Sequence, residues 1–162
     1  MVNDYHKEMV SRIIMISEPG PLYLTCSSEG KIKFWNVKDL TCYGVLHHCS
    51  MDVEAHPFQP LTPLGKMREN RKAGAKVDVD WSNPPVTQKI VDAAYLPLSQ
   101  ALAVSSIDQR ITFYSMAHPI HVLGYTDAFP GTPLCMSAVD TKGEERFLAN
   151  ELFVVGDDEG EC

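Results

Sequence analysis

Short runs of apolar residues, each followed by a turn signal, occupy most of the chain. In "SRIIMISEPGPLYLTCSS" an apolar run, a proline-containing turn and a second apolar run follow one another, and "KIVDAAYLPLSQALAVSS" repeats this order. Each segment then passes through a polar turn into a further run, "KIKFWN" in the first and "RITFYS" in the second. The pattern predicts short β-strands joined by tight turns.

The two segments are related as an internal repeat. Setting Trp35 against Tyr114 aligns them without a gap, with residue type and order preserved. The matched pairs are Ser27 with Ser106, Glu29 with Asp108, Lys31 with Arg110, Ile32 with Ile111 and Phe34 with Phe113. With a fourth strand in "TCYGVLHH" and "IHVLGYTD", each unit is predicted to be an antiparallel meander of four strands.

A third unit begins at "PLCMSAVD", continues through "LFVVGDD" and stops where its third strand is expected. The strands are apolar on both faces, because Phe34 and Trp35 are neighbours and point to opposite sides. Such strands need cover on both sides. Sheets stacked around an axis provide it, and a period of about 40 residues is typical of β-propeller blades.

The sequence therefore predicts an all-β fold, a partial β-propeller in one domain over residues 1–162. Its parts are a blade at 9–48, a loop insertion at 49–88, a blade at 89–127 and a half blade at 132–162. Since propellers close with about four to eight blades, we expect a fragment of a longer protein whose missing blades complete the ring. Rim loops near residues 18–21, 97–100 and 126–133 are candidate binding surfaces.

Composition narrows the function classes. A chain of 162 residues with 44% hydrophobic and 22% charged residues is expected to fold. The net charge of −7 argues against nucleic acid as a partner, and no apolar run approaches a membrane span. The five scattered cysteines and the absence of a secretory-type start lead us to expect a cytoplasmic protein.

Few residues suggest a catalytic or metal-binding site. His47, His48, Cys49 and Cys42 are potential zinc ligands, but adjacent histidines on a strand point to opposite faces, so one packed and one polar histidine is the preferred interpretation. The acidic run "GDDEGE" is better explained as a turn like those of the other units than as a calcium loop. No nucleophile motif or phosphate loop is present, so we expect no enzyme and no cofactor.

The insertion carries a local positive charge. Its basic residues are Lys66, Arg68, Arg71, Lys72 and Lys76. A solvated linker is the preferred interpretation. Contact with an acidic partner such as the tubulin lattice is the alternative.

The repeat resembles the WD-repeat family. The strand "KIKFWN" is similar to the family strand that ends in Trp, and Ser27, Glu29 and Trp35 stand where the family places the Ser, Asp and Trp of its structural hydrogen-bond tetrad. The corresponding residues of the second unit are Ser106, Asp108 and Tyr114. Asn36 and Ser115 replace the signature Asp, and no Gly-His pair is identified.

A narrower resemblance covers residues 89–160. There "ITFYS", "PLCM" and "GDDEG" are similar to motifs of the WD-repeat proteins of motile cilia that also carry EF-hands. This resemblance implies a non-enzymatic scaffold for other proteins, microtubule-associated and located in the axoneme of the cilium or flagellum. A generic cytosolic WD-repeat adaptor in signalling or trafficking is the alternative.

Overall fold

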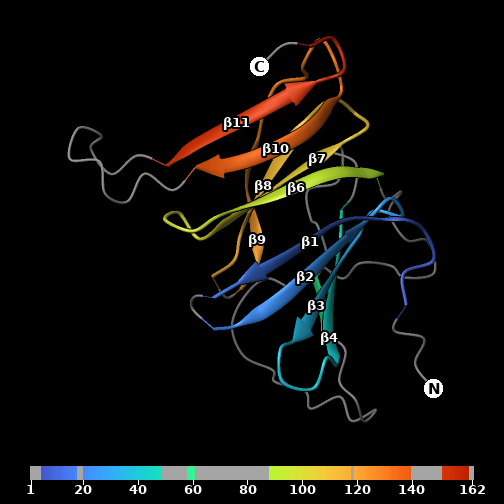
Figure 1. Cartoon of the computed structure of the whole chain (residues 1–162), viewed down its shortest axis with the longest axis vertical. Coiled ribbons are helices and arrows are strands. Elements are labelled where there is room, and N and C mark those ends of the chain that lie inside the picture. Colours follow the sequence, from blue (N-terminus) through green and yellow to red (C-terminus); the bar gives the residue numbers. More distant parts are fainter. Residues whose placement is uncertain are drawn as a thin grey trace.

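A computed structural model describes residues 5–17, 20–48, 58–60, 88–117, 119–139 and 151–160. All secondary structure in these ranges is β-strand, arranged in three antiparallel sheets (Figure 1). The first sheet has the order β1 (Val10–Ile16), β2 (Leu22–Ser27), β3 (Lys31–Asn36), β4 (Cys42–His47) and β5 (Phe58–Pro60). Its first four strands form the meander predicted for the first unit.

The second sheet is a meander of the same kind, and the third contains two strands. The second sheet has the order β6 (Ile90–Leu96), β7 (Ala101–Ser106), β8 (Ile111–Ser115) and β9 (His121–Tyr125). The third pairs β10 (Pro133–Val139) with β11 (Leu152–Asp157). The predicted all-β class and the antiparallel units are confirmed.

Strand β5 lies inside the insertion that we expected to be a loop from 49 to 88. It pairs with the outer edge of β4, with Gln59 opposite Val45. An edge strand exposes unpaired backbone groups, so even a short added strand satisfies part of β4. The remainder of the insertion, 49–57 and 61–87, lies outside the described residues.

The repeat extends to the irregularities of the sheets. The register between the first two strands of each sheet shifts near the start of the first strand, leaving Ser11, Val91 and Leu134 as the inserted residues. The turn after the second strand also recurs, with positive φ at Gly30 (77°) and Gln109 (62°). In the third sheet Gly160 has a φ of 84°, so "GDDEG" forms the same kind of turn, as predicted.

The sheets stack face to face, with the second sheet in the middle. Its first strand, β6, contacts both β1 and β10, so the first strands of the three sheets lie side by side (Figure 1). One apolar cluster joins the first and second sheets and includes Leu24, Phe34 and Tyr114. A second cluster joins the second and third sheets around Ala103 and Met136.

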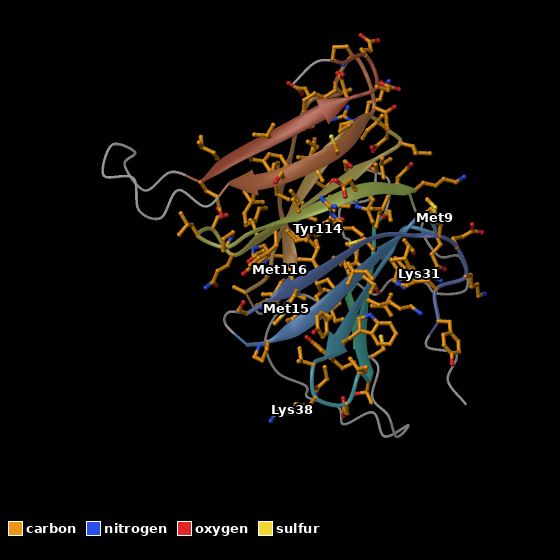
Figure 2. All side chains as sticks on the ribbon, in the orientation of Figure 1. Met9, Met15, Lys31, Lys38, Tyr114 and Met116 are labelled. Carbon is orange, nitrogen blue, oxygen red and sulfur yellow. The ribbon has the colours of Figure 1, made fainter. Side chains whose placement is uncertain are left out.

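Both outer faces of this stack carry exposed apolar side chains. On the first sheet Ile13 is 67% exposed and Met15 58%. On the third sheet Val154 is 50% exposed, although Leu24 at the corresponding position of the first sheet is fully buried. Figure 2 shows Met9 just before β1, Met15 within β1, and Tyr114 among the side chains between the two larger sheets. The first and third sheets therefore each expose an apolar face of the kind that is buried where two described sheets pack against each other.

Candidate interaction surfaces and the polar networks that brace them

A chain of hydrogen bonds crosses the outer face of the first sheet. The indole N–H of Trp35 donates to the hydroxyl of Thr25 at 2.8 Å, and this hydroxyl lies 2.6 Å from Nε2 of His6. Nδ1 of His6 lies 3.0 Å from Oε1 of Glu29. Since an indole nitrogen can only donate, the Thr25 hydroxyl is free to donate to Nε2, which leaves the proton of His6 on Nδ1, facing the carboxylate.

The charges of this network match that proton arrangement. Burial lowers the pKa of His6, opposed in part by its hydrogen bond to Glu29. Burial acts to raise the pKa of Glu29, but hydrogen bonds from Lys31, the Lys7 backbone and His6 outweigh it and lower the pKa to about 2. Lys31 Nζ lies 2.7 Å from Oε2 of Glu29. A neutral imidazole therefore donates to an ionised carboxylate.

The structure joins Glu29 and Trp35 through His6 and the hydroxyl of Thr25, whereas the Ser27 hydroxyl makes no contact in this network. Trp35 is opposite Tyr23, so Thr25 is two residues away along β2 and Ser27 four. Each two residues of strand add about 7 Å, which puts Ser27 beyond reach. The Ser27 hydroxyl instead donates to the Lys31 carbonyl at 3.4 Å.

The equivalent residues of the second sheet form separate contacts. Ser106 donates to Asp108 at 2.5 Å, across the turn between β7 and β8. Tyr114 contacts His48 instead, with 2.6 Å between the hydroxyl and Nδ1 and the two rings edge to face. His48 is the packed histidine that the sequence predicted at the end of β4, while His47 is half-buried and burial lowers its pKa.

A third network joins all three sheets and was not found from the sequence. Arg12 Nε lies 3.1 Å from Oδ1 of Asp92, and the guanidinium also donates to the carbonyls of Ala93 and Met136, at 3.2 and 3.0 Å. The other oxygen of Asp92 accepts from the Met136 backbone N–H at 2.8 Å. Arg12 and Asp92 each follow the inserted residue of their strand, so the repeat places opposite charges at equivalent positions of adjacent sheets.

In the acidic turn of the third sheet, two carboxylates accept hydrogen bonds from nearby backbone N–H groups. Asp158 Oδ1 accepts from the Thr132 N–H at 2.7 Å, and Asp157 Oδ1 accepts from the Glu159 N–H at 3.1 Å. In the described part of the chain no group of three or more His, Cys, Asp or Glu side chains is arranged to hold a metal ion. Cys49 and the basic residues Lys66, Arg68, Arg71, Lys72 and Lys76 lie outside the described residues.

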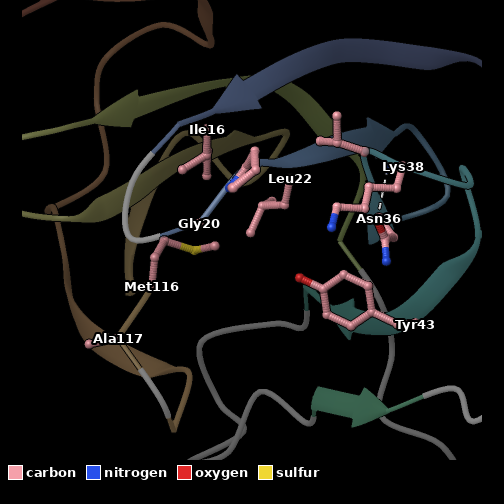
Figure 3. Close-up of a pocket in the computed structure, with 10 residues that line it drawn as sticks. Ile16, Gly20, Leu22, Asn36, Lys38, Tyr43, Met116 and Ala117 are labelled. Carbon is pink, nitrogen blue, oxygen red and sulfur yellow. Dashed lines mark hydrogen bonds between the residues drawn. The ribbon is translucent and has the colours of Figure 1, made fainter.

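One of the predicted rim loops lines a pocket, and another is hydrogen-bonded to the third sheet. A pocket of about 670 Å³ opens between the first and second sheets, and the first loop contributes Gly20 to it (Figure 3). Ile16 and Met116 form apolar walls of this pocket, with Lys38 and Tyr43 at its polar side. The second loop is tied to the third sheet, since Glu151 accepts hydrogen bonds from backbone N–H groups of that loop at 2.9 and 3.1 Å.

No protein-family model matches this chain, and no curated protein matches it significantly. Among the described residues no helix is long and apolar enough to cross a membrane.

Proposed function

We propose that the chain is a non-enzymatic scaffold for protein–protein interaction, formed by part of a WD-repeat β-propeller. The observation that supports this most is the stack of repeated antiparallel sheets whose first strands lie side by side. Repeated sheets that contact only their neighbours form extended structures with broad surfaces. The exposed apolar outer faces are the places where further blades would pack.

The network on the first sheet is a second support. Its carboxylate, imidazole, hydroxyl and indole groups are those of the tetrad that the WD-repeat resemblance implied, with Thr25 as the hydroxyl and His6 as the histidine. These side chains hold a turn and two strands together. A structural use of this kind leaves partner recognition to the rim loops and outer faces, as in a scaffold.

The most specific version of this proposal is that the protein is a microtubule-associated component of the axoneme. It is based on the resemblance of residues 89–160 to WD-repeat proteins of motile cilia. The basic run from Lys66 to Lys76 would contact the acidic tubulin surface. A generic cytosolic adaptor is the second candidate. Upstream EF-hand loops and further blades in a full-length transcript would favour the axonemal form.

Co-sedimentation with axonemal microtubules tests this form. We expect pelleting that weakens with salt and is lost when Lys66, Arg68, Arg71, Lys72 and Lys76 are changed to glutamine. A control changes three exposed lysines that lie just outside the described strands, Lys7, Lys38 and Lys89, to glutamine and should pellet like the wild type. Pelleting that survives the five changes contradicts the role of the basic run, and no pelleting at low salt contradicts the microtubule form.

A further inference from the structure

We propose that the pocket between the first and second sheets binds a medium-chain fatty acid, that is, a carboxylate with an unbranched aliphatic tail. The tail would lie against the apolar wall, and the carboxylate would accept hydrogen bonds from Lys38, Asn36 and Tyr43. The inference goes beyond the proposed scaffold function and does not depend on it, because it concerns a small molecule held within the stack of sheets.

The pocket has the size and the apolar wall that such a ligand needs. Its volume is about 670 Å³, and ligand sites in proteins commonly enclose roughly 300–1,000 Å³. Ile16 and Leu22 form its wall on the first sheet, and Met116 forms it on the segment that follows β8 (Figure 3). An aliphatic tail in this space would replace water next to apolar side chains, which is favourable.

Three hydrogen-bond donors at the polar side of the pocket have no acceptor in the described part of the chain. They are the ammonium of Lys38, the amide NH₂ of Asn36 and the hydroxyl of Tyr43. The amide oxygen of Asn36 accepts from the Lys38 backbone N–H at 2.9 Å, which leaves the NH₂ group as the available end of the amide. Burial raises the pKa of Tyr43, so its hydroxyl keeps the proton that it would donate.

Local structure holds these donors in position without a ligand. The Asn36 backbone N–H donates to the Thr41 carbonyl at 2.9 Å, which closes the turn between β3 and β4. Tyr43 is the inserted residue where the register of β3 and β4 shifts, and its ring packs against Phe34 with 6.2 Å between centroids. Figure 3 shows the Tyr43 hydroxyl pointing into the space beside Leu22. The polar side is therefore formed in advance of binding.

The charge of the pocket favours an anionic ligand. Among the described residues that line it, Lys38 is the one charged side chain. Asp39, the next residue, is not part of the wall, and its carboxylate accepts from the Thr41 N–H at 3.1 Å and from the Thr41 hydroxyl at 2.7 Å. A fatty acid brings only acceptor atoms and hydrocarbon. A peptide would also bring backbone N–H groups, which need acceptors that this set of donors does not supply.

Comparison with the second sheet shows that the polar side is not a general feature of the repeat. The equivalent positions there are Ser115, Ala117 and Leu123. The turn itself is the same, since the Ser115 hydroxyl accepts from the Ala117 N–H at 3.3 Å as the Asn36 amide does in the first sheet. The cation and the phenol are replaced by apolar side chains. The three donors therefore distinguish the first sheet from the second and do not serve to form the meander.

Isothermal titration calorimetry of the whole chain with butanoate, hexanoate, octanoate and decanoate tests the inference. We expect one saturable site with a Kd of about 1 mM or tighter for octanoate. The affinity should rise about fourfold with each methylene that the pocket encloses and then level off. Octanol has the same tail without the carboxylate and should bind about tenfold more weakly than octanoate.

Methyl NMR of the methionines shows where the ligand binds. Met116 lines the pocket, whereas Met9 and Met15 are 71% and 58% exposed beside and within β1 (Figure 2). Octanoate should shift the Met116 methyl resonance, assigned by its loss in Met116→Leu, and leave those of Met9 and Met15 unchanged. Shifts of Met9 or Met15 without a shift of Met116 would mean general adsorption to exposed apolar side chains and would overturn the inference.

Two pairs of variants test the donors. Lys38→Gln should weaken octanoate binding about tenfold, and Tyr43→Phe about fivefold, with the affinity for octanol changed less by Lys38→Gln. The controls are Lys89→Gln and Tyr125→Phe, two exposed side chains outside the pocket, which should leave the affinity unchanged.

Several outcomes contradict the inference. They are no saturation, no dependence on tail length, equal binding of octanol, or equal weakening by a variant and its control. A hexapeptide with a C-terminal leucine that binds more tightly than octanoate would overturn the choice of a fatty acid. The basic run tested by microtubule pelleting does not include these residues, so the two proposals fail separately.

Discussion

The first and second sheets have the same backbone and different polar chemistry. Both are four-strand meanders with a register shift in the first strand and a positive-φ residue after the second. On the first sheet, Glu29, His6, Thr25 and Trp35 form one continuous network. In the second, Ser106 with Asp108 and Tyr114 with His48 are separate pairs. The apolar pattern and the turns are thus enough to form the meander in both sheets. The polar side chains make different hydrogen bonds in each, because the neighbouring residues differ.

The cross-sheet ion pair is expected to have the largest effect. Asp92→Ala removes a buried carboxylate that accepts from Arg12 and from the Met136 backbone, and should lower the free energy of unfolding by about 3 kcal/mol. Urea unfolding measures this, with exposed Asp127→Ala as the control, expected within about 0.5 kcal/mol of wild type. Exchanging the charges, Arg12→Asp with Asp92→Arg, should recover part of the loss if equivalent positions of the two sheets are interchangeable. A double variant less stable than Asp92→Ala would show that they are not.

A smaller effect is expected at the carboxylate of the first network. Glu29→Gln should cost about 2 kcal/mol near neutral pH, because three donors lose an ionised acceptor. The pKa of Glu29 is lowered to about 2 from an ordinary 4.5, so its contribution is complete above pH 4.5 and is lost as the pH falls toward 2. Unfolding of the wild type and the variant should therefore converge over that range. Exposed Glu8→Gln is the control, and a constant difference down to pH 2 would contradict this account.

The two candidate hydroxyls of the first sheet can be separated directly. Thr25→Val keeps the shape of the side chain but removes the oxygen between Trp35 and His6, and should cost about 1.5 kcal/mol. Ser27→Ala should cost less, since its hydrogen bond at 3.4 Å is long. The measurement is chemical denaturation of both variants. A greater loss for Ser27→Ala would favour the residue that the sequence suggested.

The turns should show the smallest difference. Gly30 and Gln109 both have positive φ, a conformation that costs a side-chain-bearing residue about 1 kcal/mol. Gly30→Ala should destabilise by about that amount, whereas Gln109→Gly should change stability by about 0.5 kcal/mol or less, because the relieved strain is offset by greater freedom in the unfolded chain. Thermal unfolding of both variants measures the difference, and equal destabilisation would mean that the turns are not equivalent.

The strands and turns could be predicted from the sequence, whereas the side-chain hydrogen-bond networks could not. The apolar runs and turns marked the strands of both meanders because hairpins join segments that are neighbours in sequence. Thr25 could have been identified as the hydrogen-bond partner of Trp35 by setting Trp35 opposite Tyr23 and taking the nearest hydroxyl on the same face of β2. No such signal identifies His6, which lies before the first strand and reaches Thr25 through tertiary folding.

The sequence alone determined the class of fold, the repeated meander and the turns that join the first three strands of each meander, because alternation and turn chemistry act over a few residues. Only the tertiary structure decided that Arg12 meets Asp92 and that His48 meets Tyr114, since both contacts depend on which sheet stacks on which. It also decided which apolar surfaces remain open. Leu24 and Val154 have equivalent places in the repeat, but Leu24 is buried because the second sheet packs over it, whereas no sheet in the described part of the chain covers Val154.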